Sequence, residues 1–312
     1  MDVSVILLTR NTCRQTREAI ESVISSADSL SKEIHVLDNG STDETSSSLP
    51  VAFPEIHYLR MERNVGFARG VNLAARGTKG DFLLFLNSDA RLAPDALRLA
   101  VEWMRANPSC GIAGGQLFYP DGKKQNSIAN FPSLETELLN KFLLRALWPK
   151  QFPGKELEYR EPVEVQSVIG AFFLVRRKIW EKLGGMDKRF FFFLEETDFC
   201  LRARQAGFPT MHLPQVRVWH DQGQTAKQDL PAARIEYWRS RYAYFTKHHS
   251  LAVRIVLHCG LLLRLLVDSV FSGLATGLTL GQSRRWREKF AVHRALLFWH
   301  LRGCPEGVGL PR

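Results

Sequence analysis

Short apolar runs alternate with amphipathic stretches over the first hundred residues. The run 82–86 is apolar at every position, so we expect it to be buried on both faces, as in a parallel sheet covered by helices. Repeated βα units of this kind predict an α/β fold with a doubly wound, Rossmann-like, mostly parallel sheet flanked by helices. The predicted strands are 3–9, 34–37, 57–60 and 81–86, and the predicted helices are 12–26, 43–48, 66–76 and 94–106.

The pattern loosens in the middle of the chain. Residues 121–162 show no regular period, and a segment of this length is typically a functional loop or a lid. Regular patterns then return, with predicted strands at 165–175 and ending at 219–220, and predicted helices at 177–183 and 195–206.

The last sixty residues combine apolar and basic positions. In 251–273, Arg254, His258, Arg264 and Asp268 fall within an arc of about 120° at 100° per residue, which leaves a broad apolar face. Because a membrane-spanning helix rarely carries such charges near its middle, an amphipathic helix at the membrane surface is favoured. The segment 284–299 repeats the theme with tryptophans. The alternative is a helical hairpin packed on the rest of the protein.

Charge is concentrated in this tail. The 312 residues have a formal net charge of +10, and residues 251–312 contain nine basic and three acidic residues. The excess indicates an anionic partner, and a membrane surface is favoured over nucleic acid because no nucleic-acid-binding module accompanies it. The five scattered cysteines and the strand-like start at 3–8 predict a reduced, cytoplasmic protein.

Polar residues follow the predicted strands, where open α/β sheets bind ligands. There is no glycine-rich dinucleotide or P-loop motif, so another group must hold a phosphate. A carboxylate at Asp89 is suited to a divalent cation, which would bridge nucleotide phosphates. Each residue alone is an ordinary turn residue, and the signal is the whole set: Thr9-Arg10-Asn11, Asp38-Asn39-Gly40-Ser41-Thr42-Asp43, Asn87-Ser88-Asp89 and Trp219-His220-Asp221.

An ordered series of motifs resembles family 2 inverting glycosyltransferases, above all bacterial rhamnosyltransferase-like members. The resemblance covers about residues 2–250, and its order makes it specific. Its motifs are Asp38-Asn39-Gly40-Ser41-Thr42-Asp43, 63–72, Leu86-Asn87-Ser88-Asp89, 170–177, Gly184-Gly185-Met186-Asp187, 190–202, Val218-Trp219-His220 and 239–249.

The resemblance implies a GT-A fold over residues 1–250, followed by a helical appendage at 251–312. It implies that Asp38 contacts the donor base, with Thr9 and Asn11 in the same pocket, and that Asp89 binds a divalent metal, Mg²⁺ or Mn²⁺. Two positions depart from the family: Arg10 replaces a common tyrosine, and Asn87 replaces the first acid of the metal motif.

The resemblance also assigns an acid pair. Inversion at a sugar carbon needs a base for the attacking hydroxyl, and clustered carboxylates near phenylalanines have the raised pKa that suits one. We expect Glu196 to be this base, with Glu195 as the alternative. The remaining expected roles are metal or diphosphate binding for His220, donor phosphate binding for Arg69, and acceptor or phosphate binding for Gly170, Ala171, Asp198 and Arg241.

The expected activity is transfer of a sugar, rhamnose first, from a nucleoside-diphosphate sugar to a glycan or lipid-linked glycan in cell-surface polysaccharide synthesis. It would take place on the cytoplasmic face of the membrane. Two alternatives stay open: a UDP-hexose or UDP-galactofuranose donor, and a catalytically silent nucleotide-sugar-binding or scaffold protein.

Overall fold

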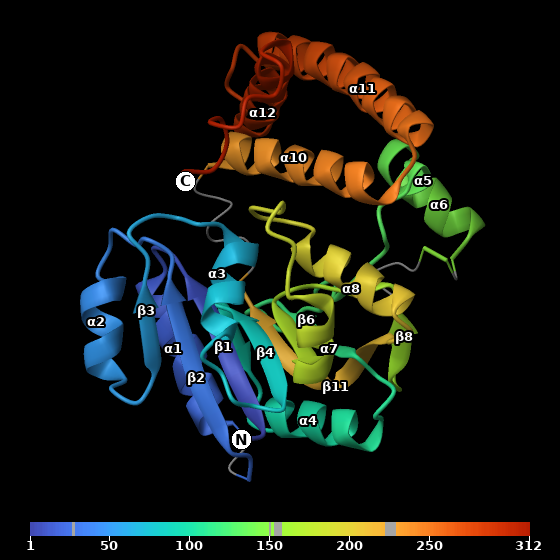
Figure 1. The fold of residues 1–312 in the computed structure, drawn as a ribbon. Helices are drawn as coiled ribbons and strands as arrows, with labels where there is room; N and C mark the ends of the chain where they lie inside the picture. The colour runs from blue at the N-terminus through green and yellow to red at the C-terminus, as the bar shows by residue number, and fades with distance from the viewer. Residues whose placement is uncertain (27–28, 150, 153–157, 222–228) are drawn as a thin grey trace.

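The computed structural model describes residues 1–26, 29–149, 151–152, 158–221 and 229–312. A central sheet carries helices on both faces, and three C-terminal helices form a further layer across the carboxyl ends of its first strands (Figure 1). This arrangement confirms the predicted α/β fold with a helical appendage.

Nine strands of the described residues form the main sheet, in the order β3-β2-β1-β4-β10-β6-β11-β5, with β8 paired to β11. The first four strands run parallel, whereas β10 is antiparallel to both of its neighbours. The strands are β1 (Val3–Thr9), β2 (Lys32–Asp38), β3 (His57–Arg60), β4 (Phe82–Asn87), β5 (Ala90–Leu92), β6 (Ile112–Phe118), β8 (Val163–Val165), β10 (Phe172–Arg176) and β11 (Thr210–His220); β7 (Ile128–Ala129) and β9 (Ser167–Val168) pair separately.

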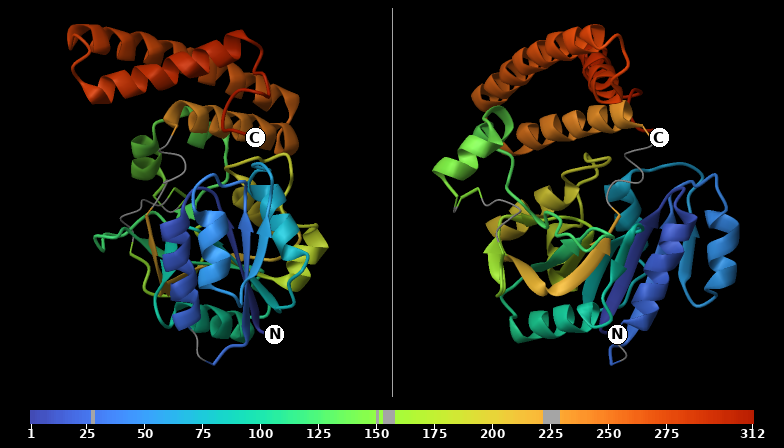
Figure 2. Two further views of the ribbon diagram at one scale, coloured as in Figure 1. Left: turned by 90° about the vertical axis from the view of Figure 1, so that its left-hand side faces the viewer. Right: turned by 180° about the vertical axis from the view of Figure 1, so that it is seen from behind.

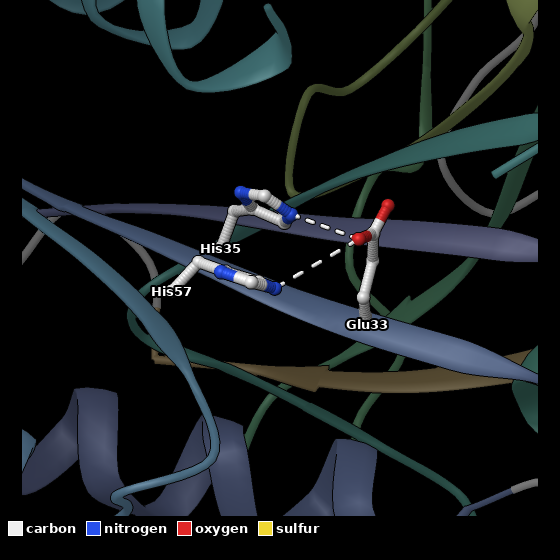
Figure 3. Close-up of side chains that lie close together, drawn as sticks. All are labelled: Glu33, His35 and His57. Carbon is white, nitrogen blue, oxygen red and sulfur yellow. Dashed lines mark ion pairs between the residues drawn. The ribbon is translucent and has the colours of Figure 1, made fainter. Parts of the chain in front are cut away.

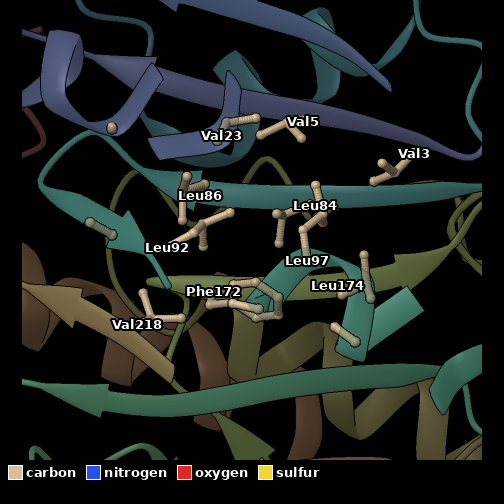
Figure 4. Packing of buried hydrophobic residues seen from close by; sticks show 14 of the residues in the cluster. Val3, Val5, Val23, Leu84, Leu86, Leu92, Leu97, Phe172, Leu174 and Val218 are labelled. Carbon is tan, nitrogen blue, oxygen red and sulfur yellow. The ribbon is translucent and has the colours of Figure 1, made fainter. Parts of the chain in front are cut away.

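Helices cover both faces of the sheet because its strands alternate apolar side chains between two cores. Val3 and Val5 of β1 join Leu84 and Leu86 of β4 in one core, against α1 and α4 (Figure 4), whereas Ile6 faces the other. The helices are α1 (Cys13–Ser25), α2 (Thr45–Ala52), α3 (Phe67–Ala75), α4 (Ala96–Ala106), α5 (Leu134–Leu138), α6 (Lys141–Leu147), α7 (Arg177–Leu183), α8 (Glu195–Gln205), α10 (Leu230–His248), α11 (Leu251–Leu278) and α12 (Arg284–Leu301).

The middle of the chain differs from expectation in two respects. The predicted irregular segment 121–162 contains α5 and α6, which begin at the capping residues Ser133 and Asn140. These short helices lack the long apolar period that would have indicated them. The single strand predicted at 165–175 is divided into β8, β9 and β10, because β9 leaves the main sheet to pair with β7.

The C-terminal helices form one packed layer. The predicted helices of the tail are present as α11 and α12, an antiparallel hairpin that packs on α10 (Figure 2). Ile235, Leu265, Leu296 and Trp299 form the small core between the three helices. The division of the chain at residue 250 stays a prediction, and α10, on its N-terminal side, packs against both tail helices.

Candidate active site

A cavity of about 590 Å³ lies beyond the carboxyl ends of β1 and β4, beneath α10. The polypeptide brings together here residues separated by more than two hundred positions. Among the predicted site residues, its walls include Thr9, Asn87, Asp89, Gly170, Ala171, Glu195, Glu196 and His220.

Asp89 and His220 face each other on one wall, with Asp89 Oδ1 3.3 Å from His220 Nε2. Gln125 orients the imidazole. Its amide nitrogen donates to the His220 carbonyl, so its Oε1, 3.1 Å from Nδ1, accepts the proton on that nitrogen. Nε2 is left facing Asp89, and Asn87 Nδ2 lies 3.4 Å from the same nitrogen. A carboxylate oxygen and an imidazole nitrogen at this separation can both bind one cation.

Glu195 and Glu196 line the same cavity, at the start of α8. The two preceding residues, Phe193 and Leu194, have positive φ angles of 76° and 67°, a strained conformation for large side chains that turns the chain sharply into the helix. Gly66 makes this turn possible, because a Cβ there would lie 2.7 Å from the Phe191 carbonyl oxygen. That carbonyl accepts a hydrogen bond from the Phe67 amide at 2.6 Å.

Burial raises the pKa of both carboxyl groups. The pKa of Glu195 lies well above its ordinary value because the group is buried and because the charges of Glu196 and Glu236 lie nearby. Burial also raises the pKa of Glu196, but the amides of Glu196, Thr197 and Gly170 stabilise its charged form. These amides favour the ionised form of Glu196, which is the form that a base requires.

Three predicted donor-binding residues have protein partners. Asp38 is fully buried, and its carboxylate accepts hydrogen bonds from the Ser41 amide and the Tyr58 hydroxyl, each at 2.8 Å. Asn11 has φ 54° and its Oδ1 accepts from the Thr42 amide at 2.7 Å. The Thr9 hydroxyl lies 2.7 Å from that of Thr16. Asp38 and Asn11 shape the loop beside the cavity, and direct donor contact by either stays a prediction.

Three further predicted residues lie away from the cavity wall. Asp198 is fully buried and pairs with Arg202, Lys247 and His248 at 2.8, 2.6 and 2.7 Å, which gives it a structural environment. Arg69 is exposed on α3. Arg241 forms an ion pair with Glu137 at 2.9 Å and lines a second cavity.

Several residues of the cavity were not predicted as site residues. Asn39 and Asn64 lie within motifs quoted above, and Asn39 Nδ2 donates to Asn64 Oδ1 at 2.7 Å. Asn64 in turn donates to the Pro311 carbonyl at 2.6 Å. Arg234 and Tyr237 of α10 also line the cavity. No local sequence pattern indicates them as site residues, because only the packing of α10 brings them to the site.

A separate group of possible metal ligands lies elsewhere on the sheet. His35 Nε2 and His57 Nε2 approach Glu33 Oε2 at 3.2 and 3.9 Å, and all three ligand atoms lie within 4.8 Å of one another (Figure 3). Glu33 precedes Asp38 by five residues along β2, about 16 Å at the usual rise per residue. A metal at this group would therefore not reach a diphosphate held beside Asp89.

Comparison with known proteins identifies the family. The model of the family "Glycosyl transferase family 2" matches residues 4–184, more than half of the chain. The chain is 27% identical over 229 residues to the N-acetylglucosaminyl-diphospho-decaprenol L-rhamnosyltransferase of Mycobacterium tuberculosis, covering 68% of this chain and 74% of that protein. It is 25% identical over 198 residues to the Escherichia coli rhamnosyltransferase WbbL, covering 61% and 73% of the two chains.

Solved structures agree on the fold. The mannosyltransferase PcManGT from Pyrobaculum calidifontis, in complex with GDP-Man and Mn²⁺, has a TM-score of 0.57 at 17% identity over 96% of this chain and 86% of its own. GalNAc-T7 with UDP, GalNAc and Mn²⁺ has a TM-score of 0.54 at 17% identity over 70% and 44% of the two chains. The chain thus has the GT-A fold and belongs to glycosyl transferase family 2, as a rhamnosyltransferase-like glycosyltransferase.

Proposed function

We propose that this protein transfers a sugar, with L-rhamnose the first choice, from a nucleoside-diphosphate donor to a lipid-linked glycan, with inversion at the anomeric carbon. The observation that carries the proposal is that two sets of groups line one cavity. Asp89 and His220 lie 3.3 Å apart, and the acid pair Glu195 and Glu196 lines the same cavity. The names of the rhamnosyltransferase relatives favour the sugar and the lipid-linked acceptor.

The residues of the cavity suit a direct displacement. The acceptor oxygen would bond to the anomeric carbon while the bond from that carbon to the diphosphate breaks and the diphosphate leaves with the electron pair. Glu196 would take the hydroxyl proton, and its raised pKa improves its strength as a base. Phe191, Phe192 and Phe193 line the same cavity and would exclude water from the reacting atoms.

Asp89 and His220 fit a divalent metal, Mg²⁺ or Mn²⁺. A carboxylate oxygen and an unprotonated imidazole nitrogen 3.3 Å apart would form a donor set that Mn²⁺ accepts, and diphosphate oxygens would complete it. When bound, the metal would stabilise the charge of the leaving diphosphate. Asn87, near the same imidazole nitrogen, would orient the ligands.

A transfer assay tests the proposed function. With Mn²⁺ or Mg²⁺, we expect the full-length protein to move rhamnose from dTDP-rhamnose onto N-acetylglucosamine linked by a diphosphate to a polyisoprenoid, with inverted anomeric configuration by NMR. UDP-hexose and UDP-galactofuranose serve as rival donors, and preference for one would change the sugar assigned. Absence of both transfer and nucleotide-sugar hydrolysis with every donor would favour a silent binding protein.

We also propose that α11 lies in the surface of an anionic membrane. By length and composition α11 is the one helix of the described residues that could cross a membrane, with a mean hydropathy of 1.8 in its most apolar window. Only 22% of that window is buried, and Leu263, Val270 and Leu274 are each more than 60% exposed. An apolar face of this size on the outside of a protein indicates a membrane or a partner.

A membrane-surface position suits the helix better than a spanning one. Arg264 and Asp268 lie toward the side of α11 that carries the buried Leu261 and Leu265, so the apolar face points away from the protein. The neighbouring α12, which packs along α11, carries basic residues that a spanning arrangement would draw into hydrocarbon: Arg284, Arg285, Arg287, Lys289 and Arg294.

Charges placed on this face should release the protein from membranes. We expect the double variant Leu263→Glu/Val270→Glu to lower the bound fraction at least about tenfold, because each buried aliphatic side chain contributes roughly 1.5–3 kcal/mol. Flotation with phosphatidylethanolamine and phosphatidylglycerol vesicles measures it. Val51→Glu, at a position 81% exposed on α2, is the matched control. Unchanged flotation of the double variant would contradict the proposal.

A further inference from the structure

A second cavity, of about 1030 Å³, lies between α5, α10, α11 and α12, outside the cavity that holds the acid pair. Leu230, Arg234 and Tyr237 line both cavities, so the two spaces adjoin along α10. A ligand in the second cavity would therefore contact residues that also line the cavity of Glu196.

The walls of the second cavity are amphipathic. Leucines from four helices, including Leu138 of α5, Leu261 of α11 and Leu296 of α12, form its apolar part, together with Trp238. Five basic and three acidic residues form the polar part. Such a lining suits an amphiphile with a negatively charged group better than a free sugar, which offers neither a charge nor a long apolar chain.

The three acids of this cavity already have partners. Glu137 pairs with Arg241 at 2.9 Å, Asp268 with Arg264 at 3.7 Å, and Glu288 with Arg284, outside the lining, at 2.6 Å. Arg234, Arg285 and Lys289 have no ion pair within the part of the chain that the structure describes. Three unmatched cations around one space match a diphosphate.

The start of α12 holds two of these cations in place. The Arg285 guanidinium and the Lys289 ammonium lie 5.6 and 4.8 Å from the centre of the Trp286 ring, which packs edge-on against Phe271 of α11. The cation pair is therefore ordered against the helix whose other face is exposed and apolar. A lipid that leaves the membrane beside α11 would meet these cations first.

We infer that this second cavity binds the diphosphate and the first isoprenoid units of a lipid-linked acceptor, with Arg234, Arg285 and Lys289 on the diphosphate. The inference rests on the proposed function. The diphosphate would lie between the membrane surface and the donor cavity, and the sugar attached to it would enter past Arg234 and Tyr237 to reach Glu196.

The test compares two acceptors that carry the same sugar. One is linked through a diphosphate to a polyisoprenoid, and the other is a water-soluble glycoside without phosphate. In Arg285→Glu/Lys289→Glu we expect KM for the lipid-linked acceptor to rise at least tenfold, and kcat/KM for the glycoside to stay within twofold of wild type. Arg285→Gln/Lys289→Gln, which avoids charge reversal, should show a smaller rise in the same direction.

A matched control separates the cavity from general surface charge. Arg287→Glu/Arg294→Glu makes the same charge change on the same helix, at exposed positions outside the cavity lining, and should leave both acceptors unaffected. The inference would be overturned if this control lost as much activity on the lipid-linked acceptor as Arg285→Glu/Lys289→Glu does, or if the cavity variant lost equal activity on both acceptors. An unchanged KM of the cavity variant for the lipid-linked acceptor would also overturn it.

Vesicle flotation of both variants shows whether the cavity binds a phospholipid headgroup instead of the acceptor. If only the cavity variant were released from the vesicles, the acceptor assignment would be overturned. Failure of the wild type with both acceptors would contradict the proposed function itself.

Discussion

Replacing Glu196 by glutamine should lower kcat by roughly 10²–10⁴-fold, the usual contribution of a general base. Donor affinity should stay the same, because the carboxylate acts on the acceptor hydroxyl. Glu195→Gln should lower kcat less, since fewer backbone amides stabilise the charged form of Glu195 than that of Glu196. Steady-state transfer assays, with donor binding followed by calorimetry, measure both effects.

The pH dependence follows from the direction of the pKa shift. Glu196 must be ionised to accept a proton, and burial raises its pKa, so the wild-type rate should rise with pH through a midpoint above the ordinary glutamate value. A carboxyl group whose pKa is raised by folding opposes folding once it ionises. Glu196→Gln should therefore be at least as stable as the wild type, which excludes misfolding as the cause of lost activity.

A control substitution makes the comparison specific. Glu181→Gln changes an exposed glutamate on α7, outside the cavity lining, and should leave the rate unchanged. Full transfer activity in Glu196→Gln would remove Glu196 from the role of base. If only Glu195→Gln lowered the transfer rate, Glu195 would take the role of base.

Replacing Asp89 by asparagine should abolish metal-dependent donor binding. The loss in kcat/KM should be at least about 100-fold, the upper end of the cost when only a residue supporting a metal ligand is removed. The reason is that the neutral amide lacks the negative charge that would attract the proposed cation beside His220 Nε2. Calorimetric titration with the nucleoside diphosphate, with and without Mn²⁺, separates this effect from the loss of the base.

The two predictions have different signatures. Asp89→Asn should weaken nucleotide binding only when metal is present, whereas Glu196→Gln should leave that binding intact. Asp95→Asn, the same change at an exposed position on the loop before α4, is the control. Metal-enhanced nucleotide binding of wild-type strength in Asp89→Asn would show that the metal ligands lie elsewhere.

Local sequence was sufficient for the first half of the fold. The strands β1 and β4 are almost wholly apolar runs separated by helical patterns, so the parallel part of the sheet could be predicted. The short helices α5 and α6 could not, because a capping box over five residues is a weak signal beside a long apolar period.

The candidate site likewise has features that the sequence predicts and features that only the packing decides. Asp89, Glu195, Glu196 and His220 could be expected because each stands at the end of a strand or the start of a helix within a recognisable motif. Their facing across one cavity depends on β11 returning to pair beside β5, which places His220 near Asp89 from 131 positions away. The environments of Asp38 and Asp198 are also matters of packing, since buried ion pairs and hydrogen bonds join distant segments.

The sequence by itself determined the family, the catalytic chemistry expected and the amphipathic character of the tail, because motifs and helical periodicity are properties of neighbouring residues. Only the tertiary structure decided how that tail packs. The packing of α10 against α11 and α12 turns the charged side of α11 inward and its apolar side outward, and it forms a cation-lined cavity that shares Leu230, Arg234 and Tyr237 with the candidate active site. These features depend on contacts between helices, which no local pattern encodes.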